Sequence, residues 1–335
     1  MTPESATLLG TPGTVGSLSY LAESATSSLY RNGEVLTCRD HDGSDTGTEG
    51  VLKDRLEVVV NNARLLDKPQ RRTIETHGFE LLTRSLERSD LNFYDHRQVV
   101  QEYYAECARI VQEASGAAHV FAFDHNIRSA TGKKRKKRIT GGQEVQGPAH
   151  MVHADYTLTS GPQRLRDLAY PPGGNDTLRS VLDEGESLLE PDMVERALDA
   201  AGRFAIINLW RSIAHEPVAT DPLALCDGQT VIPDDLVVFE IHYRDRIGEN
   251  YFAKHARQHG WWYYPAMTRD EALLIKQWDS AGELSRSCGV RADSDAGEGQ
   301  GPCTFSFHSA FKDPATPPDA PDRQSMEVRC IVLYN

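Results

Sequence analysis

Short apolar runs fill much of this 335-residue chain, and their length is the feature that most constrains its fold. Most of them lie in the C-terminal half, where each is seven to nine residues long and lies between Pro, Gly or Asp clusters, a pattern typical of β-strands. These runs are FAIINLW (204–210), DLVVFEIHY (235–243), WWYYPAM (261–267), EALLIKQWD (271–279), CTFSFHSAF (303–311) and MEVRCIVLY (326–334). With an earlier alternating run at 119–130, they predict an antiparallel sandwich or jelly roll.

Helical periodicity occurs mainly before these runs. Residues 96–115 place apolar side chains at spacings of three and four before Gly116, which predicts an amphipathic helix of about five turns. A second helix is expected over residues 191–203, which begin with Pro191 and have Gly202 near their end. The expected fold class is therefore mostly β with α, with an N-terminal helical layer.

The first 50 residues differ from the rest of the chain. They are rich in Ser, Thr and Gly and alternate only weakly, which indicates an irregular N-terminal arm (1–50) with one or two strands. No internal repeat is visible downstream. We therefore expect residues 51–335 to form a single domain with supporting helices.

The charge of the chain limits its partners. A net charge of −13 repels polyanions, so nucleic acid is not an expected partner. The exception is a run of six basic residues at 133–138, which lies between Gly132 and the pair Gly141-Gly142. Because such runs are usually solvated, we expect an exposed loop, with nuclear localisation or nucleic-acid binding as the alternative.

No segment predicts export or membrane insertion. The first residues lack a basic stretch followed by an apolar one, and no later stretch approaches the roughly 20 apolar residues of a membrane span. The six cysteines contain no CxxC pair, so neither a zinc ribbon nor a disulfide framework is expected. We expect a cytoplasmic protein with reduced thiols and no membrane partner.

The stretch MVHADYTLTSGP (151–162) carries a possible metal-binding pair. Alternate residues of a strand point to one face, so His153 and Asp155 can approach the same ion. With 12 histidines and 49 acidic residues, one or two His-x-acid pairs are expected by chance. A downstream strand offers a third ligand, His308, and two histidines with one carboxylate can hold Fe(II) with open positions. The other downstream histidines considered lie beside charged or turn residues: His215, His242 and His255.

Polar residues inside apolar strands supply candidates for anion binding. Arg323 and Ser325 share one strand face and can together clamp a carboxylate. Arg329 has the same parity and is the rival clamp, with an ion pair to a nearby carboxylate as its alternative role. Asn208 interrupts an apolar strand and is expected either to reach a bound small molecule or to make a structural hydrogen bond.

Five further residues are candidates for contact with a substrate. Trp262 and Tyr264 have the spacing to line one wall, Ile331 and Leu333 lie beyond the clamp, and Arg211 belongs to the polar cluster around Asn208. Packing in the core is the alternative for each of the apolar residues, and a structural hydrogen bond is the alternative for Arg211.

Several segments, taken in order over residues 75–335, resemble the Fe(II)/2-oxoglutarate-dependent oxygenase superfamily. They are VHADYT, IINLWRSI, DPLALCD, WWYYPAM, KQWDS, FHSAF and DRQSMEVR. The likeness is to the group of natural-product oxygenases that contains gibberellin desaturase and 7α-cephem methoxylase homologues. Two positions depart from that group's pattern, Ser212 where proline is common and Gln324 where glutamate is common, and neither is a proposed ligand.

The resemblance implies a double-stranded β-helix, that is, a cupin-like jelly-roll core. It implies Fe(II) held by His153, Asp155 and His308, with 2-oxoglutarate and O2 as co-substrates. Arg323 and Ser325 would hold the distal carboxylate of 2-oxoglutarate. The implied reaction is hydroxylation, desaturation or oxidative ring formation at a C–H bond of a small natural-product intermediate.

Two other functions stay open at this point. Arg-x-Ser also occurs in the isopenicillin N synthase branch, where it holds the substrate carboxylate and no 2-oxoglutarate is used. A non-catalytic jelly-roll binding protein is the alternative of a different class. The sequence does not decide whether the chain forms a homo-oligomer.

Overall fold

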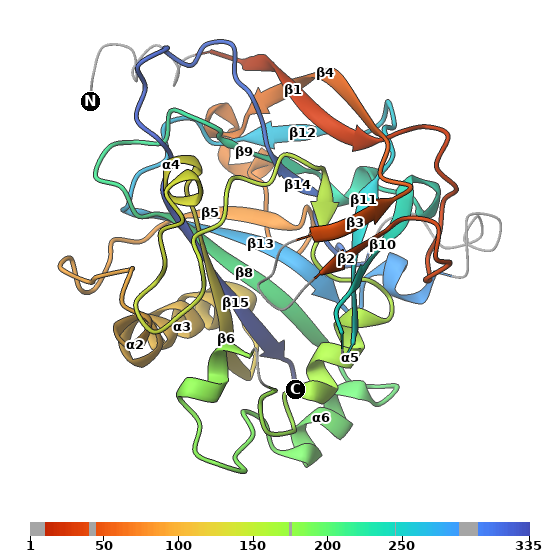
Figure 1. Cartoon of the computed structure of the whole chain (residues 1–335), viewed down its shortest axis with the longest axis vertical. Coiled ribbons are helices and arrows are strands. Elements are labelled where there is room, and N and C mark those ends of the chain that lie inside the picture. The colour runs from red at the N-terminus through yellow and green to blue at the C-terminus, as the bar shows by residue number, and fades with distance from the viewer. Residues whose placement is uncertain (1–10, 40–44, 174–175, 245, 288–300) are drawn as a thin grey trace.

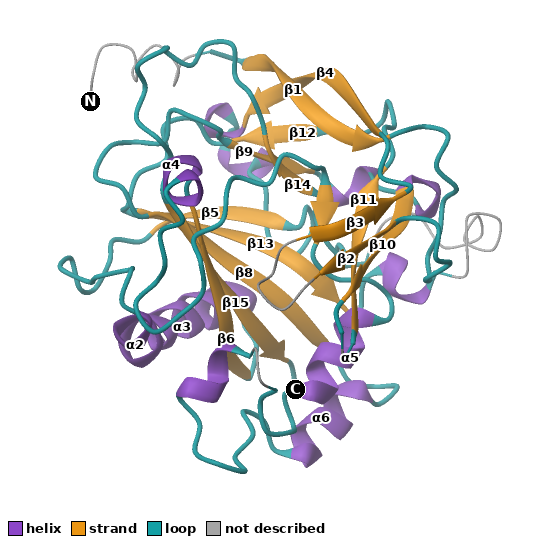
Figure 2. Ribbon diagram, viewed as in Figure 1, coloured by secondary structure: helices purple, strands orange, loops and turns teal. Residues whose placement is uncertain are grey.

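The protein is mostly β, with helices at its periphery (Figures 1 and 2). The computed structural model describes residues 11–39, 45–173, 176–244, 246–287 and 301–335. None of the helices in these ranges combines the length and apolar character needed to cross a membrane. The strands of the described residues form two sheets.

The larger sheet is mixed, because β10 pairs with β2 and β12 pairs with β4 in parallel. Its described strands run in the order β1 (Gly13–Leu21), β4 (Lys53–Asn62), β12 (Trp261–Tyr263), β9 (Leu223–Cys226), β14 (His308–Ala310), β7 (His153–Ala154), β11 (Ile247–Ala253), β10 (Leu236–His242), β2 (Leu36–Arg39) and β3 (Asp45–Glu49). Short strands at its centre, β14 and β7, carry the two histidines of the predicted iron site.

The smaller sheet is antiparallel throughout its described strands. Its order is β5 (Phe79–Thr83), β13 (Glu271–Asp279), β8 (Phe204–Ser212), β15 (Ser325–Leu333) and β6 (His119–Arg128). All nine residues of β8 are buried, because both faces of the sheet are covered. On one face Trp210 of β8 and Leu273 of β13 pack in a cluster with Leu225 of the larger sheet, so the two sheets meet there.

The N-terminal residues are more ordered than their composition predicts. β1 pairs with β4 over its whole length, and Leu18 and Tyr20 are fully buried in the core of the larger sheet. The sequence suggested one or two strands before residue 50, whereas the described residues there contain three, β1, β2 and β3; the boundary at residue 50 stays a prediction. The weak alternation reflects small side chains on the outer face of β1, whereas the few large ones on its inner face are enough to anchor it.

The predicted helix at 96–115 is present, with a π-helical turn (η3, Val99–Tyr103) between α2 (His96–Gln98) and α3 (Tyr104–Ser115). The Asp95 side chain caps its first turn, and Gly116 ends it with a φ of 66°. The helix packs on β6, β15 and β8. β1 to β5 precede it in the chain, so the helices do not form a layer before the strands.

The other described α-helices are α4 (Ala130–Lys134), α5 (Ser160–Asp167) and α6 (Pro191–Leu198). Short 3-10 helices lie in the connections: η1 (Ala63–Leu65), η2 (Lys68–Gln70), η4 (Thr177–Ser180), η5 (Gly228–Thr230), η6 (Pro233–Asp235) and η7 (Glu283–Arg286). Helix α6 ends at Leu198, earlier than the Gly202 that the sequence suggested. The predicted strand at 303–311 is also shorter than expected, since only His308–Ala310 is assigned as strand. Element boundaries are thus where the sequence pattern is least informative.

One buried histidine joins the long helix to the smaller sheet. Nδ1 of His125 on β6 lies 2.8 Å from the Tyr104 hydroxyl of α3, and its ring stacks on His96 with centroids 5.3 Å apart. Burial lowers the pKa of His125 to about 4. The folded protein therefore keeps this imidazole neutral at pH values where the unfolded chain protonates it.

Replacing His125 with asparagine should make stability less dependent on pH. In the unfolded chain the pKa of histidine is near 6.5, so between about pH 6.5 and pH 4 the unfolded state takes up a proton that folded His125 does not, and stability falls. In metal-free protein, the substitution should remove roughly 2 kcal/mol of the loss in unfolding free energy between pH 7 and pH 5. Urea unfolding at both pH values measures this loss, and equal losses in the two proteins would contradict the prediction.

Candidate metal centre

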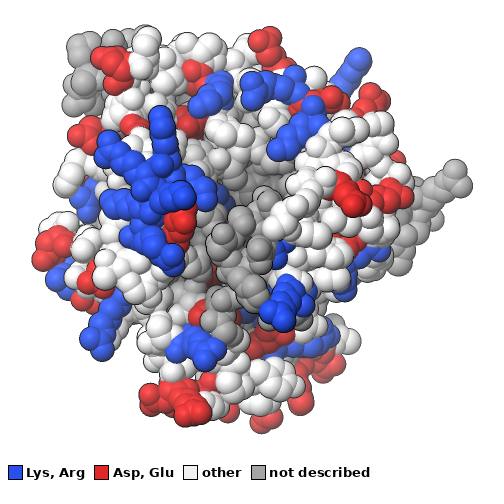
Figure 3. Space-filling view, viewed as in Figure 1, with Lys and Arg blue, Asp and Glu red and all other residues white. Residues whose placement is uncertain are grey.

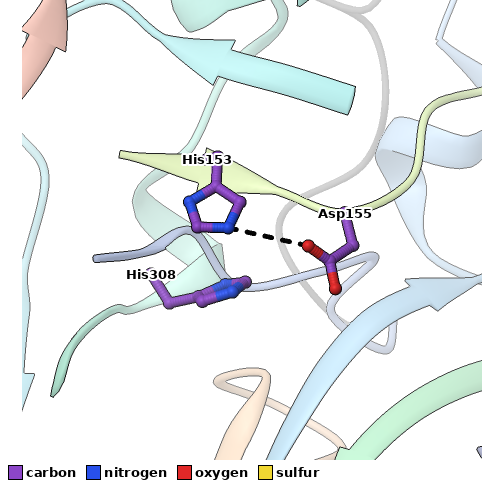
Figure 4. A group of neighbouring side chains, drawn as sticks. All are labelled: His153, Asp155 and His308. Atoms are coloured by element: carbon purple, nitrogen blue, oxygen red, sulfur yellow. Dashed lines mark ion pairs between the residues drawn. The ribbon is translucent and has the colours of Figure 1, made fainter. Parts of the chain in front are cut away.

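The two histidines and the aspartate predicted as iron ligands lie together between the sheets. His153 and His308 occupy directly paired positions on β7 and β14, and Asp155 follows β7 by one residue. One ligand atom from each of the three lies within 4.8 Å of the others. Figure 4 shows the two imidazoles and the carboxylate pointing toward one another. Three donors in this arrangement can occupy one face of a metal ion.

Backbone carbonyls fix the tautomer of each histidine. His153 Nδ1 lies 2.7 Å from the Met151 carbonyl oxygen, and His308 Nδ1 lies 3.3 Å from that of Ser306. Because a carbonyl oxygen can only accept a hydrogen bond, each Nδ1 carries the proton and each Nε2 has a free lone pair. This is the usual outer-shell arrangement of metal-binding histidines. His153 Nε2 lies 3.6 Å from Asp155 Oδ1, on the side where an ion would bind.

The Asp155 carboxylate is held through one oxygen only. Its Oδ2 accepts from Asn208 Nδ2 at 3.1 Å and from Arg329 Nη2 at 3.2 Å, while Oδ1 faces His153. Arg329 also binds Asp124 at 2.8 Å and Glu327 at 3.3 Å. Arg329 is therefore not a free clamp for 2-oxoglutarate, and its alternative role, an ion pair with nearby carboxylates, is the one observed. The described contact of Asn208 is likewise with Asp155, not with an open binding position.

The protonation states of the three residues suit metal binding. Burial and the neighbouring His308 ring lower the pKa of His153 to about 4, and burial also lowers the pKa of His308. For Asp155, burial would raise the pKa, but the Arg329 guanidinium and the two imidazoles outweigh it and hold that pKa well below its usual range. At neutral pH the site presents two neutral imidazoles and one carboxylate.

A cavity opens beside His153 and His308, and Arg323 of the predicted clamp is part of its lining. The cavity is lined by Arg128, Ala149, His153, Trp210, Leu223, His308, Ala310, Arg323 and Glu327. Arg323 is only 3% exposed and forms no ion pair with a described carboxylate, although its Nη1 donates to the Asp221 carbonyl oxygen. Burial, followed by the charge of Arg128, lowers the pKa of Arg323 to about 10.

Unsatisfied polar atoms gather around Arg323. Arg323 Nε, Ser325 Oγ and Ser212 Oγ are buried without a hydrogen-bond partner, and Ser325 lies directly opposite Ser212 on the neighbouring strand. Buried donors without partners are uncommon and costly. A cation and two hydroxyls of this kind suit a bound carboxylate, so the residues present fit the distal end of 2-oxoglutarate.

Two charged residues of the cavity wall, Glu327 and Arg128, were missed by the sequence analysis. Glu327 is buried on β15, where it follows Arg323 and Ser325 at alternate positions, and this period of two was the signal that could have identified it. Arg128 ends β6 and gave no comparable signal. Burial, then the nearby Asp155, raise the pKa of Glu327.

The four apolar residues predicted to contact a substrate lie in two different clusters of the core. Trp262 and Tyr264 pack in the cluster that contains the cavity residue Trp210, and Trp262 stacks with Arg72 at 4.2 Å. Neither residue lines the cavity itself, so their contact with a substrate stays a prediction. Ile331 and Leu333 are buried in the main core cluster, and no described contact brings either to the three ligands.

The prediction that Arg211 contacts substrate is wrong. Its side chain leaves β8 on the face opposite to Asn208 and points toward the long helix. There Nε donates to the Tyr103 hydroxyl at 2.9 Å, and Nη2 lies 3.5 Å from Glu106. With Nη1 bound to the carbonyl oxygens of Arg84 and Arg269, the guanidinium is fully engaged in joining the helix to the sheet.

Comparison with known proteins gives matches over most of the chain. A family model described as "Oxidoreductase/YMDC permease-like domain" matches residues 18–333. The Fe(II)/2-oxoglutarate-dependent dioxygenase nvfI of Aspergillus novofumigatus is 31% identical over 277 residues, 79% of this chain and 80% of its own. An uncharacterized protein in the dcmA 3′ region of Methylophilus leisingeri is 41% identical over 196 residues, 58% of this chain and 89% of its own.

A solved structure shares the fold. The iron and alpha-ketoglutarate-dependent endoperoxidase NvfI, in a structure with a different conformation, superposes with a TM-score of 0.71 at 23% identity, covering 97% of this chain and 99% of the other. The agreement extends over both sheets of the described residues, since nearly the whole chain is covered.

Proposed function

The chain belongs to the Fe(II)/2-oxoglutarate-dependent dioxygenases, and we propose that His153, Asp155 and His308 hold its iron. It is an oxidoreductase that uses Fe(II), 2-oxoglutarate and O2. This use of 2-oxoglutarate disfavours the two alternatives, an iron oxidase without a co-substrate and a non-catalytic binding protein. We also propose that Arg323 and Ser325 bind the distal carboxylate of 2-oxoglutarate.

The buried, unpaired cation of Arg323 is the observation that carries this assignment. A guanidinium that is 3% exposed and has no described carboxylate partner is costly in the free protein. Arg323 lines the same cavity as His153 and His308, so one bound molecule can reach both the clamp and the metal ligands. A dicarboxylate whose keto acid end chelates the metal satisfies both requirements.

The protein's own contribution to the reaction is binding and orientation. Fe(II) held by His153, Asp155 and His308, together with 2-oxoglutarate, would supply the O2-dependent oxidation of a C–H bond, with succinate and carbon dioxide as the products of the co-substrate. The Met151 and Ser306 carbonyl oxygens orient the two imidazoles, and Arg329 with Asn208 orients Asp155 so that Oδ1 faces the metal position. The apolar cluster around Trp210 covers one side of the cavity and limits the access of water.

The finer predictions from the sequence are retained as part of this proposal. We propose that the two sheets form a double-stranded β-helix and that the substrate is a small natural-product intermediate. A cytoplasmic location is supported by the described cysteines, which are free thiols: Cys38, Cys107, Cys226, Cys303 and Cys330. Trp262 and Tyr264, which pack in the same cluster as the cavity residue Trp210, are retained as candidates for shaping the substrate wall.

Iron binding and succinate formation test the proposed function directly. The purified protein, prepared without metal, should bind one Fe(II) per chain in an anaerobic titration. With O2 and 2-oxoglutarate it should form succinate, even slowly, without an added substrate, and a substrate should accelerate this. Omission of iron, or replacement of 2-oxoglutarate by succinate, is the control. A protein that binds iron but forms no succinate across a broad substrate panel would overturn the proposal.

A further inference from the structure

We propose that the substrate of this enzyme is an organic anion, whose carboxylate or phosphate group binds Arg128 inside the cavity. Resting on the function proposed above, this inference names the class of substrate for that site. The proposal has a second part, which concerns the exposed residues 133–138, here called the basic strip. We propose that the basic strip attracts the anion to the cavity. Three sets of observations support it: the charges in the cavity, the position of the strip, and the charge of the whole chain.

The cavity holds one more cation than 2-oxoglutarate requires. Arg323 is assigned to the distal carboxylate of the co-substrate, and Arg329 is already bound to Asp155, Asp124 and Glu327. Arg128 also lines the cavity, but its one described hydrogen bond is from Nη1 to the Gly147 carbonyl oxygen, at 3.1 Å.

Arg128 forms no ion pair with any acidic residue in the described part of the chain. A half-buried guanidinium without a carboxylate partner is an anion site that the fold leaves open. Because the co-substrate is already accounted for, the group that remains to bind there is the substrate.

The basic strip begins directly beyond Arg128. Arg128 ends β6, Ser129 caps α4 by accepting from the Gly132 amide at 2.8 Å, and α4 carries the first residues of the strip. The Asp322 carboxylate accepts from Ser129 Oγ at 2.6 Å, which fixes α4 beside Arg323, the next residue in the chain. The strip is therefore anchored at the edge of the cavity wall.

Most of the strip is free to interact with a ligand. All six residues are exposed, and Figure 3 shows them as one blue cluster beside a hollow of this face. Lys133 lies 3.3 Å from Glu144, and the Lys137 ammonium stacks on the Tyr94 ring. Four members have no acidic partner among the described residues: Lys134, Arg135, Lys136 and Arg138.

The position of the strip matters because the rest of the chain is acidic. A net charge of −13 repels anions from most of the surface. A dense positive cluster at one edge of a cavity attracts anions instead of repelling them. It therefore raises the local concentration of anions and their rate of entry. Because the strip is exposed, its effect should weaken as salt rises, whereas the contact with Arg128 should persist.

Matched acids and amides test the proposal. Protein loaded with Fe(II) and 2-oxoglutarate under anaerobic conditions is titrated calorimetrically with phenylacetate and phenylacetamide, with hexanoate and hexanamide, and with hexyl phosphate and hexanol. In at least one pair the anion should bind at least tenfold more tightly than its neutral partner, since a charge-assisted hydrogen bond replaces a neutral one. In Arg128→Gln that ratio should fall close to one, and Arg128→Lys should retain part of it.

The strip is tested by a second variant in which Lys134, Arg135, Lys136 and Arg138 are replaced by glutamine. Stopped-flow measurements should show association of the anion slowed several-fold at low salt and little changed at high salt. The control for a general loss of surface charge is Lys53→Gln with Arg55→Gln, which neutralises two exposed basic residues of β4 outside the strip and the cavity lining. This control should associate with the anion as the unmodified protein does.

Failure of the proposal differs from failure of the proposed function. Equal affinity for anion and neutral partner in every pair, or an anion preference that survives in Arg128→Gln, would overturn the anion proposal while 2-oxoglutarate binding stays intact. A loss of 2-oxoglutarate binding in Arg128→Gln would overturn it as well, by assigning Arg128 to the co-substrate. A normal association rate in the strip variant would overturn the role of the strip. If the unmodified protein binds no 2-oxoglutarate at all, the proposed function itself fails.

Discussion

Replacing Asp155 with alanine is expected to abolish iron binding and, with it, succinate formation. The substitution removes the one charged ligand of the three-residue site, and it also removes the carboxylate that accepts from Asn208 and Arg329. Changes to outer-shell residues alone cost 10- to 100-fold in metal affinity, so loss of a ligand should exceed about 100-fold. Anaerobic titration with Fe(II) measures the affinity, and turnover of 2-oxoglutarate should fall to the level of the metal-free protein.

Asp155→Ala removes both a proposed iron ligand and a partner of Arg329, so a matched control must remove a partner of Arg329 alone. Asp124 binds the same guanidinium at 2.8 Å but is not part of the three-residue site, so Asp124→Asn removes one partner of Arg329 and leaves Asp155 in place. Asp124→Asn should bind iron within a few-fold of the unmodified protein. Circular dichroism and urea unfolding establish that both variants are folded. Unchanged iron binding in folded Asp155→Ala would contradict the site assignment, as it would in His153→Ala.

Much of the fold could be predicted because the strands are short and apolar. Runs such as FAIINLW and EALLIKQWD became β8 and β13, since their length and bounding residues leave few alternatives. The N-terminal strands could not be predicted in the same way. β1 has only a few large side chains, and its place in the larger sheet depends on pairing with β4 and with residues distant in the chain.

The grouping of His153, Asp155 and His308, the proposed metal ligands, could be predicted because local parity and chain order both restrict these residues. The partners of the arginines could not be predicted in this way. Parity predicts that Arg323, two residues before β15, and Arg329, within β15, point to the same side, but it does not say which carboxylate each will meet. The structure brings Asp155 to Arg329, whereas no carboxylate of the described residues forms an ion pair with Arg323 and its Nε has no hydrogen-bond partner there. Parity could have excluded Arg211, since it is three positions from Asn208 and therefore on the opposite face of the strand.

Replacing Arg323 with methionine is expected to abolish binding of 2-oxoglutarate while iron binding is retained. Removing one partner of a buried, hydrogen-bonded charge pair costs about 2–5 kcal/mol, which corresponds to a rise in Kd of roughly 30-fold to more than 1,000-fold. The same substitution is not expected to destabilise the protein in the absence of 2-oxoglutarate. Because the Arg323 cation is buried without a carboxylate, its replacement by an apolar side chain of similar length should leave the unfolding midpoint unchanged or raise it.

Two thermal-unfolding scans therefore distinguish a binding role for Arg323 from a structural one. Saturating 2-oxoglutarate should raise the midpoint of the unmodified protein and should not raise that of Arg323→Met. Arg323→Lys keeps the charge but loses the planar fork, so its affinity for 2-oxoglutarate should lie between that of the unmodified protein and that of Arg323→Met. Ser325→Ala should weaken binding by a smaller factor, because it removes one hydrogen bond.

A structural role for Arg323 predicts a lower unfolding midpoint without ligand and normal binding of 2-oxoglutarate, and that combination would refute the clamp. If instead 2-oxoglutarate binds Arg323→Met normally but the protein's substrate no longer binds, Arg323 holds the substrate carboxylate, and the roles of Arg323 and Arg128 must be exchanged.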